Sequence, residues 1–317
     1  MGKIKVGLYG LRGHQIHPLF LKPEPHPLAQ LTAVAGFGDK QMPEGVRAYE
    51  TLDELLADPE VELVSLCSPF RSMQAADAAK ALNAKKHVYA EKPVAMTARE
   101  LDAIIKAAKT NERHFHEMGG VQFQQPYKTM HEIVKSGVLG EIIQIHGQKC
   151  YPWTERRPTD ENVDGGLAMQ VGIYLTRFVE HVACQKISAL TLQETKHGNP
   201  VAGHNCRMAV TMQMKLANGG LASGIANYLN PMGDKVWGYE ILRIFGTQGL
   251  VESNPEEKTV RVVIQNKPPQ IIDAKSGSES YFDMFLRTLL GTDTMPMSLE
   301  DELSPTRWII HAREPMM

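Results

Sequence analysis

The sequence lacks an excess of charge of either sign. Its 34 lysine and arginine side chains are balanced by 36 aspartate and glutamate side chains, which leaves a formal net charge of -2 at pH 7. Nonspecific binding to DNA or RNA depends on basic side chains that neutralise phosphates. The charge balance therefore argues against a nucleic-acid partner and gives equally little support for binding to a membrane surface.

Long apolar runs are also missing. Every apolar stretch is interrupted by a charge, a glycine or a proline well before the roughly 18 residues that would indicate a membrane span. The first residues enter a strand-like run almost at once, without the apolar core and small-residue cleavage site of a signal peptide. We therefore expect no membrane partner and a cytoplasmic location.

Cysteine is scarce, and no pair of cysteines has the C-x-x-C spacing of a zinc or redox site. The small number and wide spacing of the cysteines argue against a zinc finger and against a disulfide scaffold. His114, His116 and Glu117 suggest metal ligands, but alternation along a strand places the histidines on one face and Glu117 on the other. We interpret them as structural residues and predict no metal site.

What the first 118 residues do contain is a regular alternation of short apolar strands and helices. Strand-like runs at residues 4–10, 31–36, 61–67 and 87–90 alternate with helical segments, two of which begin with capping boxes at 51–54 and 97–100. This alternation predicts a doubly wound parallel sheet. The length of the chain predicts two domains, and we place the first at residues 1–118.

The pattern changes in the second predicted domain, residues 119–317. Residues 208–216 alternate with period two, and Asn218 and Gly219 give a hairpin turn into residues 221–229. These features predict an α+β domain with a mainly antiparallel sheet and helices on one face. Further strands are predicted at residues 240–245 and 260–265, and helices at 126–136, 167–182, 281–290 and 299–311.

The turn after the first strand occupies the position of a phosphate-binding loop, in which a helix N-terminus binds a pyrophosphate. The G-x-G-x-x-G fingerprint would need glycine at positions 10, 12 and 15, but residues 10–15 read GLRGHQ. From this motif alone, dinucleotide binding and a plain strand-to-helix turn both remain open. The candidate cofactor-binding residues of the turn are Gly10, Arg12, Gly13, His14 and Gln15.

The acidic residue that binds ribose hydroxyls after the second strand is missing, because residues 36–40 read GFGDK. Its loss removes repulsion against a 2'-phosphate, which Arg12 and Lys40 could attract. We expect NAD or NADP as the cofactor and favour NADP. Alternatively, Asp39 still reaches the ribose.

Polar groups also follow the next two predicted strands. Open α/β sheets bind ligands outside the carboxyl ends of their strands, which makes these residues cofactor-binding candidates. Lys92 precedes a proline, so its backbone is restricted and its ammonium is directed. Alternatively, Glu91 and Lys92 form a solvated ion pair. The candidates are Cys67, Ser68, Pro69, Glu91 and Lys92.

In the helix predicted at residues 167–182, Gln170 and Tyr174 are four residues apart and share a face. Gly165, Gly166 and Gly172 would let this helix approach a flat surface closely. Alternatively, Tyr174 is a half-buried packing residue whose hydroxyl is satisfied.

Together with residues 136–141 (SGVLGE) and 245–249 (FGTQG), these motifs occur in an order that resembles the Gfo/Idh/MocA family, which includes glucose-fructose oxidoreductase and inositol dehydrogenase. The resemblance covers nearly the whole chain. It implies a Rossmann domain, a second domain with a large open antiparallel sheet that often makes dimer or tetramer contacts, and an active site in the cleft between them. It also implies hydride transfer between a nicotinamide and a small sugar-like substrate, in a homodimer or homotetramer.

Carried over by position, the resemblance implies that Lys92 contacts cofactor and substrate. Many members read D-x-G-x-H in the later helix, where the histidine is the acid/base, whereas residues 170–174 here read QVGIY. Other branches place tyrosine at this position, so Tyr174 is predicted to exchange the proton. A free tyrosine has a pKa of roughly 10, so the phenolate would need stabilisation by Lys92 and the nicotinamide. The predicted catalytic residues are Lys92, Tyr174 and Gln170, and the predicted substrate-binding residues are Gln122, Trp153, Gln170 and Tyr174.

Two other functions stay open. The missing glycines, ribose acid and Asp/His pair fit a non-catalytic member that binds a dinucleotide or sugar as a regulator. Other relatives use tightly bound NAD for elimination or glycoside cleavage. Arg156 and Arg157 lie in a loop that could meet an acidic substrate or could simply be solvated.

Overall fold

The computed structural model describes residues 2–13, 16–20, 24–234 and 236–314, and for His17 the backbone alone. The chain forms two compact units, which are described separately below. The first comprises residues 1–119, 162–164 and 281–303, and the second comprises residues 120–161, 165–280 and 304–317. The predicted domain boundary at residue 118 stays a prediction.

The first unit contains a six-stranded sheet in the order β3-β2-β1-β4-β5-β6, and all its strand pairs are parallel. Its central strands are almost continuously apolar and buried, as expected for a parallel sheet covered on both faces. The prediction of a doubly wound parallel sheet is confirmed. The strands are β1 (Ile4–Tyr9), β2 (Ala29–Ala35), β3 (Arg47–Tyr49), β4 (Leu63–Leu66), β5 (His87–Ala90) and β6 (Phe115–Glu117).

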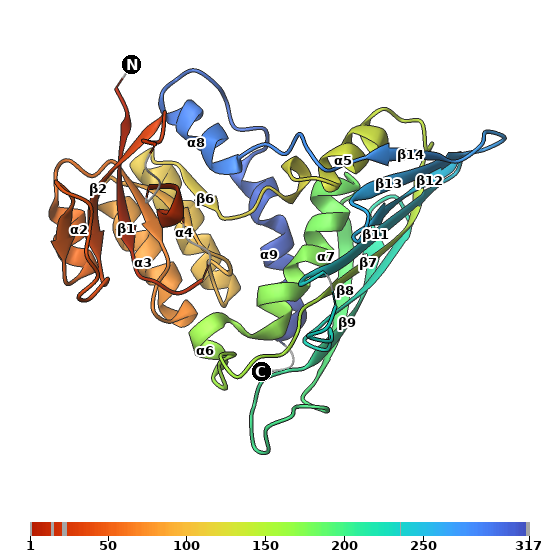
Figure 1. Cartoon of the computed structure of the whole chain (residues 1–317), viewed down its shortest axis with the longest axis horizontal. Helices are drawn as coiled ribbons and strands as arrows, with labels where there is room; N and C mark the ends of the chain where they lie inside the picture. The colour runs from red at the N-terminus through yellow and green to blue at the C-terminus, as the bar shows by residue number, and fades with distance from the viewer. Residues whose placement is uncertain (1, 14–15, 21–23, 235, 315–317) are drawn as a thin grey trace. The chain divides into compact units, whose positions relative to one another are not determined.

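Helices α2, α3 and α4 lie beside this sheet (Figure 1). Both predicted capping boxes are present: Thr51 begins α2 and Thr97 begins α4, each accepting a hydrogen bond from the backbone N–H of a glutamate three residues later. The helices of this unit are α1 (His17–Phe20), α2 (Leu52–Ala57), α3 (Arg71–Asn83), α4 (Ala98–Asn111) and α8 (Tyr281–Leu289), while α6 (Glu161–Asp164) and α9 (Leu299–Arg313) contribute residues to both units.

His114, His116 and Glu117, which the sequence suggested are structural residues, make packing and hydrogen-bond contacts in the first unit. His116 Nδ1 lies 2.6 Å from Glu302 Oε2, and the backbone N–H of Glu117 donates to Glu302 Oε1 at 2.7 Å. The rings of His114 and His116 stack with centroids 6.3 Å apart, so the two side chains share a face. Among the residues that the structure describes, no group of three or more histidine, cysteine or acidic side chains could hold a metal ion.

The second unit contains an eight-stranded sheet, sheet B, in the order β14-β13-β12-β11-β7-β10-β9-β8. Its pairs are antiparallel except β7 with β10, which confirms a mainly antiparallel sheet. Four of its strands match predicted ones, namely β9 (Ala209–Leu216), β10 (Leu221–Asn227), β11 (Tyr239–Gly246) and β13 (Thr259–Ile264). The sequence analysis missed β7 (Ile142–Cys150), β8 (Ile187–Thr195), β12 (Gly249–Asn254) and β14 (Gln270–Asp273).

Figure 1 shows α5 and α7 on one face of sheet B and none of the labelled helices on its other face. The helical stretch predicted at residues 167–182 is present, but two of its three segments are π-helical rather than α-helical. No helix within the described ranges is long and apolar enough to cross a membrane. The helices of this unit are the 3-10 helix η1 (Val121–Phe123), α5 (Tyr127–Lys135), the π-helix η2 (Ala168–Gly172), α7 (Ile173–Arg177) and the π-helix η3 (Phe178–Val182).

Glycines bring this helical stretch close to sheet B. A Cβ added at Gly172 would lie 2.4 Å from the Cε of Met212 on β9, and one added at Gly224 on β10 would lie 2.9 Å from side-chain atoms of Leu175. The predicted close approach to a flat surface therefore holds for Gly172. Gly166 instead has a positive φ of 77° at the turn before the helix.

Candidate functional site

The turn after β1 is pressed against the end of β4. Gly10 has a φ of 75°, and a Cβ at this position would lie only 2.0 Å from the carbonyl oxygen of Cys67. The backbone N–H of Gly10 donates to the carbonyl of Ala35 on β2 at 3.0 Å. Only glycine fits this backbone, because any side chain would meet both strain and a carbonyl oxygen.

The same turn continues over two buried side chains. Gly13 has a φ of 97°, and a Cβ there would lie 2.5 Å from Arg71 Nη2 and 2.9 Å from Glu91 Cγ. A dinucleotide-binding turn requires a backbone that can approach closely without side chains. Gly10 and Gly13 therefore fit the predicted nicotinamide dinucleotide, although the turn lacks the G-x-G-x-x-G spacing. His14 and Gln15 lie outside the described residues.

Arg71 at the start of α3 connects the turn to the ends of β4 and β5. Arg71 is 1% exposed, and its guanidinium donates hydrogen bonds to the backbone carbonyls of Arg12 at 2.8 Å, Ser68 at 3.0 Å and Lys92 at 3.2 Å. Burial lowers the pKa of Arg71, while the nearby Glu91 opposes the shift. Arg71 therefore fixes the backbone of three segments that sequence reasoning treated as separate motifs.

Gln74, also in the first turn of α3, completes this network. Its side-chain oxygen accepts from the backbone N–H of Ser68 at 2.9 Å and from Arg71 at 3.2 Å, and its amide donates to the carbonyl of Glu91. Sequence reasoning missed both Arg71 and Gln74. The available signal was their position in the first helical turn after a strand end, where side chains point back to the sheet edge.

The residues after β4 are inert as nucleophiles. Ser68 is fully buried, and its hydroxyl donates to Asp77 Oδ2 at 2.7 Å. Burial raises the pKa of Asp77 and raises the pKa of the Cys67 thiol to about 12. Cys67 is therefore a neutral thiol at physiological pH, and these side chains support the backbone rather than react.

Glu91 and Lys92 follow β5, and they do not form a solvated pair. Their side chains are 2% and 8% exposed, and Lys92 Nζ lies 3.9 Å from Glu91 Oε1. The alternative of a solvated ion pair is therefore wrong. Buried charges are costly unless they are compensated, which makes this strand end a better candidate for a binding role than an exposed pair would be.

The residues that follow β2 do not decide between the two cofactors. Gly36 has a φ of 71° and ends the strand, while Asp39 and Lys40 are both exposed. Arg12 is exposed on the neighbouring turn. Because β1 and β2 are adjacent parallel strands, their carboxyl ends lie at the same sheet edge.

In the second unit, Tyr174 on α7 is half-buried and lies against a buried lysine. Lys149 Nζ on β7 is 3.7 Å from the centroid of the Tyr174 ring, and Lys149 is 3% exposed. Lys149 also forms an ion pair with Glu240 on β11. Gln170, on the π-helical segment before α7, is half-buried as well. The sequence analysis did not identify Lys149.

The predicted substrate-binding residues also lie in the second unit. Gln122 on η1 is 3% exposed, and Trp153 is half-buried with its ring 6.2 Å from that of His204. Arg157 is not simply solvated, since its guanidinium carbon lies 3.5 Å from the Tyr228 ring centroid and its Nη2 donates to the Pro152 carbonyl at 2.9 Å. Whether Gln122 and Trp153 act beside Tyr174 stays a prediction.

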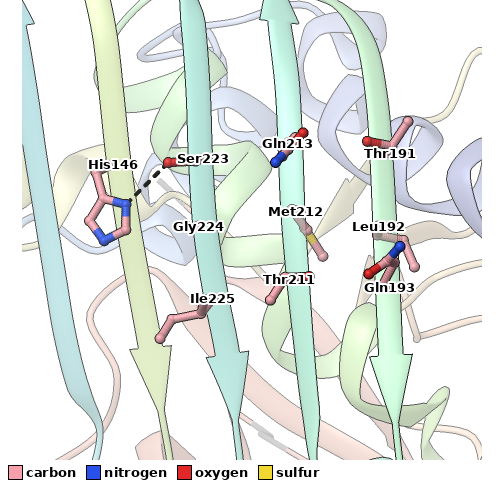
Figure 2. Close-up of a pocket in the computed structure, with 10 residues that line it drawn as sticks. All are labelled: His146, Thr191, Leu192, Gln193, Thr211, Met212, Gln213, Ser223, Gly224 and Ile225. Carbon is pink, nitrogen blue, oxygen red and sulfur yellow. Dashed lines mark hydrogen bonds between the residues drawn. The ribbon is translucent and has the colours of Figure 1, made fainter.

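A separate pocket of about 370 Å³ lies on the exposed face of sheet B (Figure 2). Hydroxyl and amide side chains from β8, β9 and β10 line it, and His146 Nδ1 on β7 lies 3.2 Å from Ser223 Oγ. None of the predicted catalytic, cofactor-binding or substrate-binding residues lines this pocket. It is therefore distinct from both sets of candidate residues.

Comparisons with known families agree with this arrangement. Residues 6–118 match the model of the oxidoreductase family with an NAD-binding Rossmann fold, and residues 127–252 match the model of the GFO/IDH/MocA C-terminal domain. Among curated proteins, an uncharacterized oxidoreductase of Rhizobium meliloti (ORF334) is 31% identical over 130 residues, covering 40% of this chain and 39% of that protein. An inositol 2-dehydrogenase of Salmonella typhimurium is 31% identical over 101 residues, covering 32% and 30%. The chain thus aligns with less than half the length of these relatives.

Solved structures share the fold over nearly the whole chain. A putative oxidoreductase from Thermotoga maritima has a TM-score of 0.85 at 24% identity, covering 98% of this chain and 97% of that one. An aldose-aldose oxidoreductase from Caulobacter crescentus has a TM-score of 0.81 at 22% identity, covering 99% and 98%. With both family models matched in order, the chain belongs to the Gfo/Idh/MocA family of oxidoreductases and carries its NAD-binding Rossmann domain.

Proposed function

We propose that this protein is an NAD(P)-dependent oxidoreductase that transfers a hydride between a nicotinamide and a carbinol or carbonyl carbon of a small, sugar-like substrate. The observation that carries the proposal is the turn at residues 10–13, whose glycines leave no room for a Cβ and whose backbone is held by buried Arg71. A turn built for close backbone approach at the end of β1 suits a pyrophosphate.

The roles of the site residues are part of the proposal. Bound nicotinamide dinucleotide would supply the hydride acceptor or donor. The Lys92 ammonium would polarise the substrate oxygen, and the Tyr174 phenol would give a proton to that oxygen during reduction and take it back during oxidation. Gln170 would hydrogen-bond a substrate hydroxyl without adding a charge. These assignments follow the family positions carried by residues 91–93 and 170–174.

The substrate class rests on the relatives' names. An inositol 2-dehydrogenase and an aldose-aldose oxidoreductase are among the similar proteins, and both names indicate polyhydroxylated compounds. We propose such a compound here too. NADP is the favoured cofactor because Arg12 and Lys40 are exposed at the edge where β1 and β2 end. We also propose that the exposed face of sheet B makes homodimer or homotetramer contacts.

The test is titration of the purified protein with NADH and NADPH, followed by nicotinamide fluorescence. We expect saturable micromolar binding that is tighter for NADPH and is weakened by Arg12→Ala and by Lys92→Ala. Arg99→Ala is the matched control, because Arg99 is exposed on α4 of the same unit. Failure of folded, cofactor-free protein to bind either nucleotide would contradict the proposal. A dinucleotide that stays bound through purification would instead favour use of NAD as a retained redox group.

A further inference from the structure

We propose that Lys149 is a positioning residue for the proton transfer assigned to Tyr174: it holds the phenol ring and stabilises its anionic form. The inference rests on the proposed oxidoreductase function, because the proton transfer belongs to that reaction. It assigns a role to a buried lysine that is not among the candidate residues predicted from the sequence.

The ammonium of Lys149 lies directly over the face of the Tyr174 ring. Lys149 comes from β7 in the middle of sheet B, and its ammonium lies 3.7 Å from the centroid of the Tyr174 ring. A cation this close to a ring face is attracted by its quadrupole and resists rotation of the ring. The Tyr151 ring lies on the same ammonium at 5.0 Å from its centroid. Lys149 thus fixes one face of the proposed proton donor.

An ion pair with Glu240 allows the buried ammonium of Lys149 to keep its charge. Glu240 lies directly opposite Lys149 in the β7–β11 register and forms an ion pair with it. The other carboxylate oxygen of Glu240 accepts a hydrogen bond from the Tyr127 hydroxyl. A buried ion survives when it is paired and its partner is hydrogen-bonded. Glu240 therefore compensates Lys149 without taking its place at the ring.

Other polar and charged side chains also lie near the Tyr174 ring. From its own helix, the Arg177 guanidinium carbon lies 5.9 Å from the ring centroid. From α5 and from the end of β7, Tyr127 and Tyr151 face the same region, and burial raises the pKa of both, which keeps them neutral. Lys149 and Arg177 thus bring positive charge close to the ring, and Glu240 brings negative charge through its ion pair with Lys149.

The chemical consequence is a preference between the two forms of Tyr174. During oxidation the substrate O–H bond would break and its proton would pass to the Tyr174 oxygen, and a bound oxidised nicotinamide would accept the hydride, with its two electrons, from the carbinol carbon. Tyr174 must begin that step as the phenolate, and an ammonium near the ring favours the phenolate. Lys149 is nearer to the ring centroid than Arg177, at 3.7 Å against 5.9 Å, and residue 170 is a glutamine that adds no negative charge to oppose it.

The direct test is a titration of Tyr174 in protein without substrate or cofactor. Tyrosine labelled with ¹³C at Cζ reports ionisation by NMR, and Tyr174→Phe identifies the resonance. We expect Lys149→Met to move the Tyr174 midpoint upward by about 1 pH unit or more, as loss of a neighbouring opposite charge does. Lys149→Arg should keep the wild-type midpoint, and Lys215→Met is the matched control, since Lys215 is exposed on β9. Equal midpoints in wild type and Lys149→Met would overturn the inference.

Glu240→Gln covers the case in which Lys149→Met does not fold. It leaves Lys149 in place, keeps an acceptor for Tyr127 and removes the negative charge, so the Tyr174 midpoint should fall below that of wild type. An unchanged or raised midpoint would contradict the inference. This titration needs no turnover, so its failure is separate from failure of the proposed function.

Kinetics then tests the link to the reaction. In the oxidation direction we expect Lys149→Met to lower kcat by about 10- to 100-fold with little change in KM, and the pH at which kcat is half-maximal should rise. A kcat that falls with no shift of the pH profile would indicate a merely structural role. The Tyr174 midpoint could rise in Lys149→Met as expected while the wild-type protein shows no NAD(P)-dependent turnover of any polyol. In that case the proposed function fails, and the proton-transfer role fails with it.

Discussion

In each unit a buried cation lies beside a predicted functional segment, Arg71 in the first and Lys149 in the second, and the two make different kinds of contact. Arg71 in the first unit donates to backbone carbonyls of three segments, so its guanidinium holds the main chain in place. Lys149 in the second unit pairs with Glu240 and lies on the Tyr174 ring, so its charge acts on a side chain. Burial alone therefore does not distinguish a cation that supports the fold from one that affects the ionisation of a neighbouring side chain. The groups that each cation contacts make this distinction.

Arg71→Met gives the largest expected effect on stability. The substitution removes the donor of the hydrogen bonds to the carbonyls of Arg12, Ser68 and Lys92, and we expect it to destabilise the first unit by about 3–5 kcal/mol. Hydrogen exchange of the β4 and α3 amides measures this loss locally. The three tryptophans lie at positions 153, 237 and 308, all in the second unit, so tryptophan fluorescence is the internal control. Unchanged protection of β4 would show that Arg71 does not hold the turn.

Gly10→Ala should have the next largest effect. Its new Cβ would lie 2.0 Å from the Cys67 carbonyl oxygen at a positive φ, and we expect a loss of about 2–3 kcal/mol. Gly38→Ala is the matched control, because Gly38 also has a positive φ but no atom within 4 Å of the added Cβ. The difference between the two variants, from hydrogen exchange of β1, isolates the contact with Cys67. Equal losses would mean that backbone strain alone is responsible.

A smaller, pH-dependent effect on stability is expected in the first unit. Burial lowers the pKa of His87 to about 4, with His114 and Arg113 adding to the shift, whereas an unfolded histidine titrates near 6.5. Between these values the unfolded chain binds more protons than the folded one, so stability rises with pH and is lost as the pH falls from about 6.5 towards 4.

Denaturation with urea at pH 7 and pH 5, with the same exchange readout, measures that loss. His87→Asn removes the titrating group while keeping an acceptor for the backbone N–H of His114, which donates to His87 Nδ1 at 3.0 Å. We expect a shallower pH dependence in this variant. A slope as steep as that of wild type would assign the loss to other groups.

The sequence predicted those features that depend on neighbours along the chain. The central strands β2 and β4 of the first sheet are almost continuously apolar, and α2 and α4 begin with capping boxes at Thr51 and Thr97. Strand β9 alternates because every second side chain, from Val210 to Leu216, enters the core of the second unit. Each of these signals is local, so the fold class followed from them.

The residues that sequence reasoning missed depend on partners far away. Strand β7 ends in GQKC, which has no apolar alternation, and Lys149 is buried because Glu240 lies 91 residues later in the chain. Arg71 donates to the carbonyl of Arg12, 59 residues earlier. In isolation a lysine in a strand and an arginine at a helix start both suggest solvent exposure. Their roles became visible only with the partners in place.

The measurement that tests the account most directly is NADPH binding to Arg71→Met and Lys149→Met side by side, followed by nicotinamide fluorescence. If Arg71 holds the dinucleotide turn and Lys149 serves proton transfer, the Arg71 variant should bind at least about 10-fold more weakly, a loss of about 1.4 kcal/mol, while the Lys149 variant binds like wild type. Equal weakening of NADPH binding in both variants, or wild-type affinity in Arg71→Met, would contradict the separate roles assigned to Arg71 and Lys149.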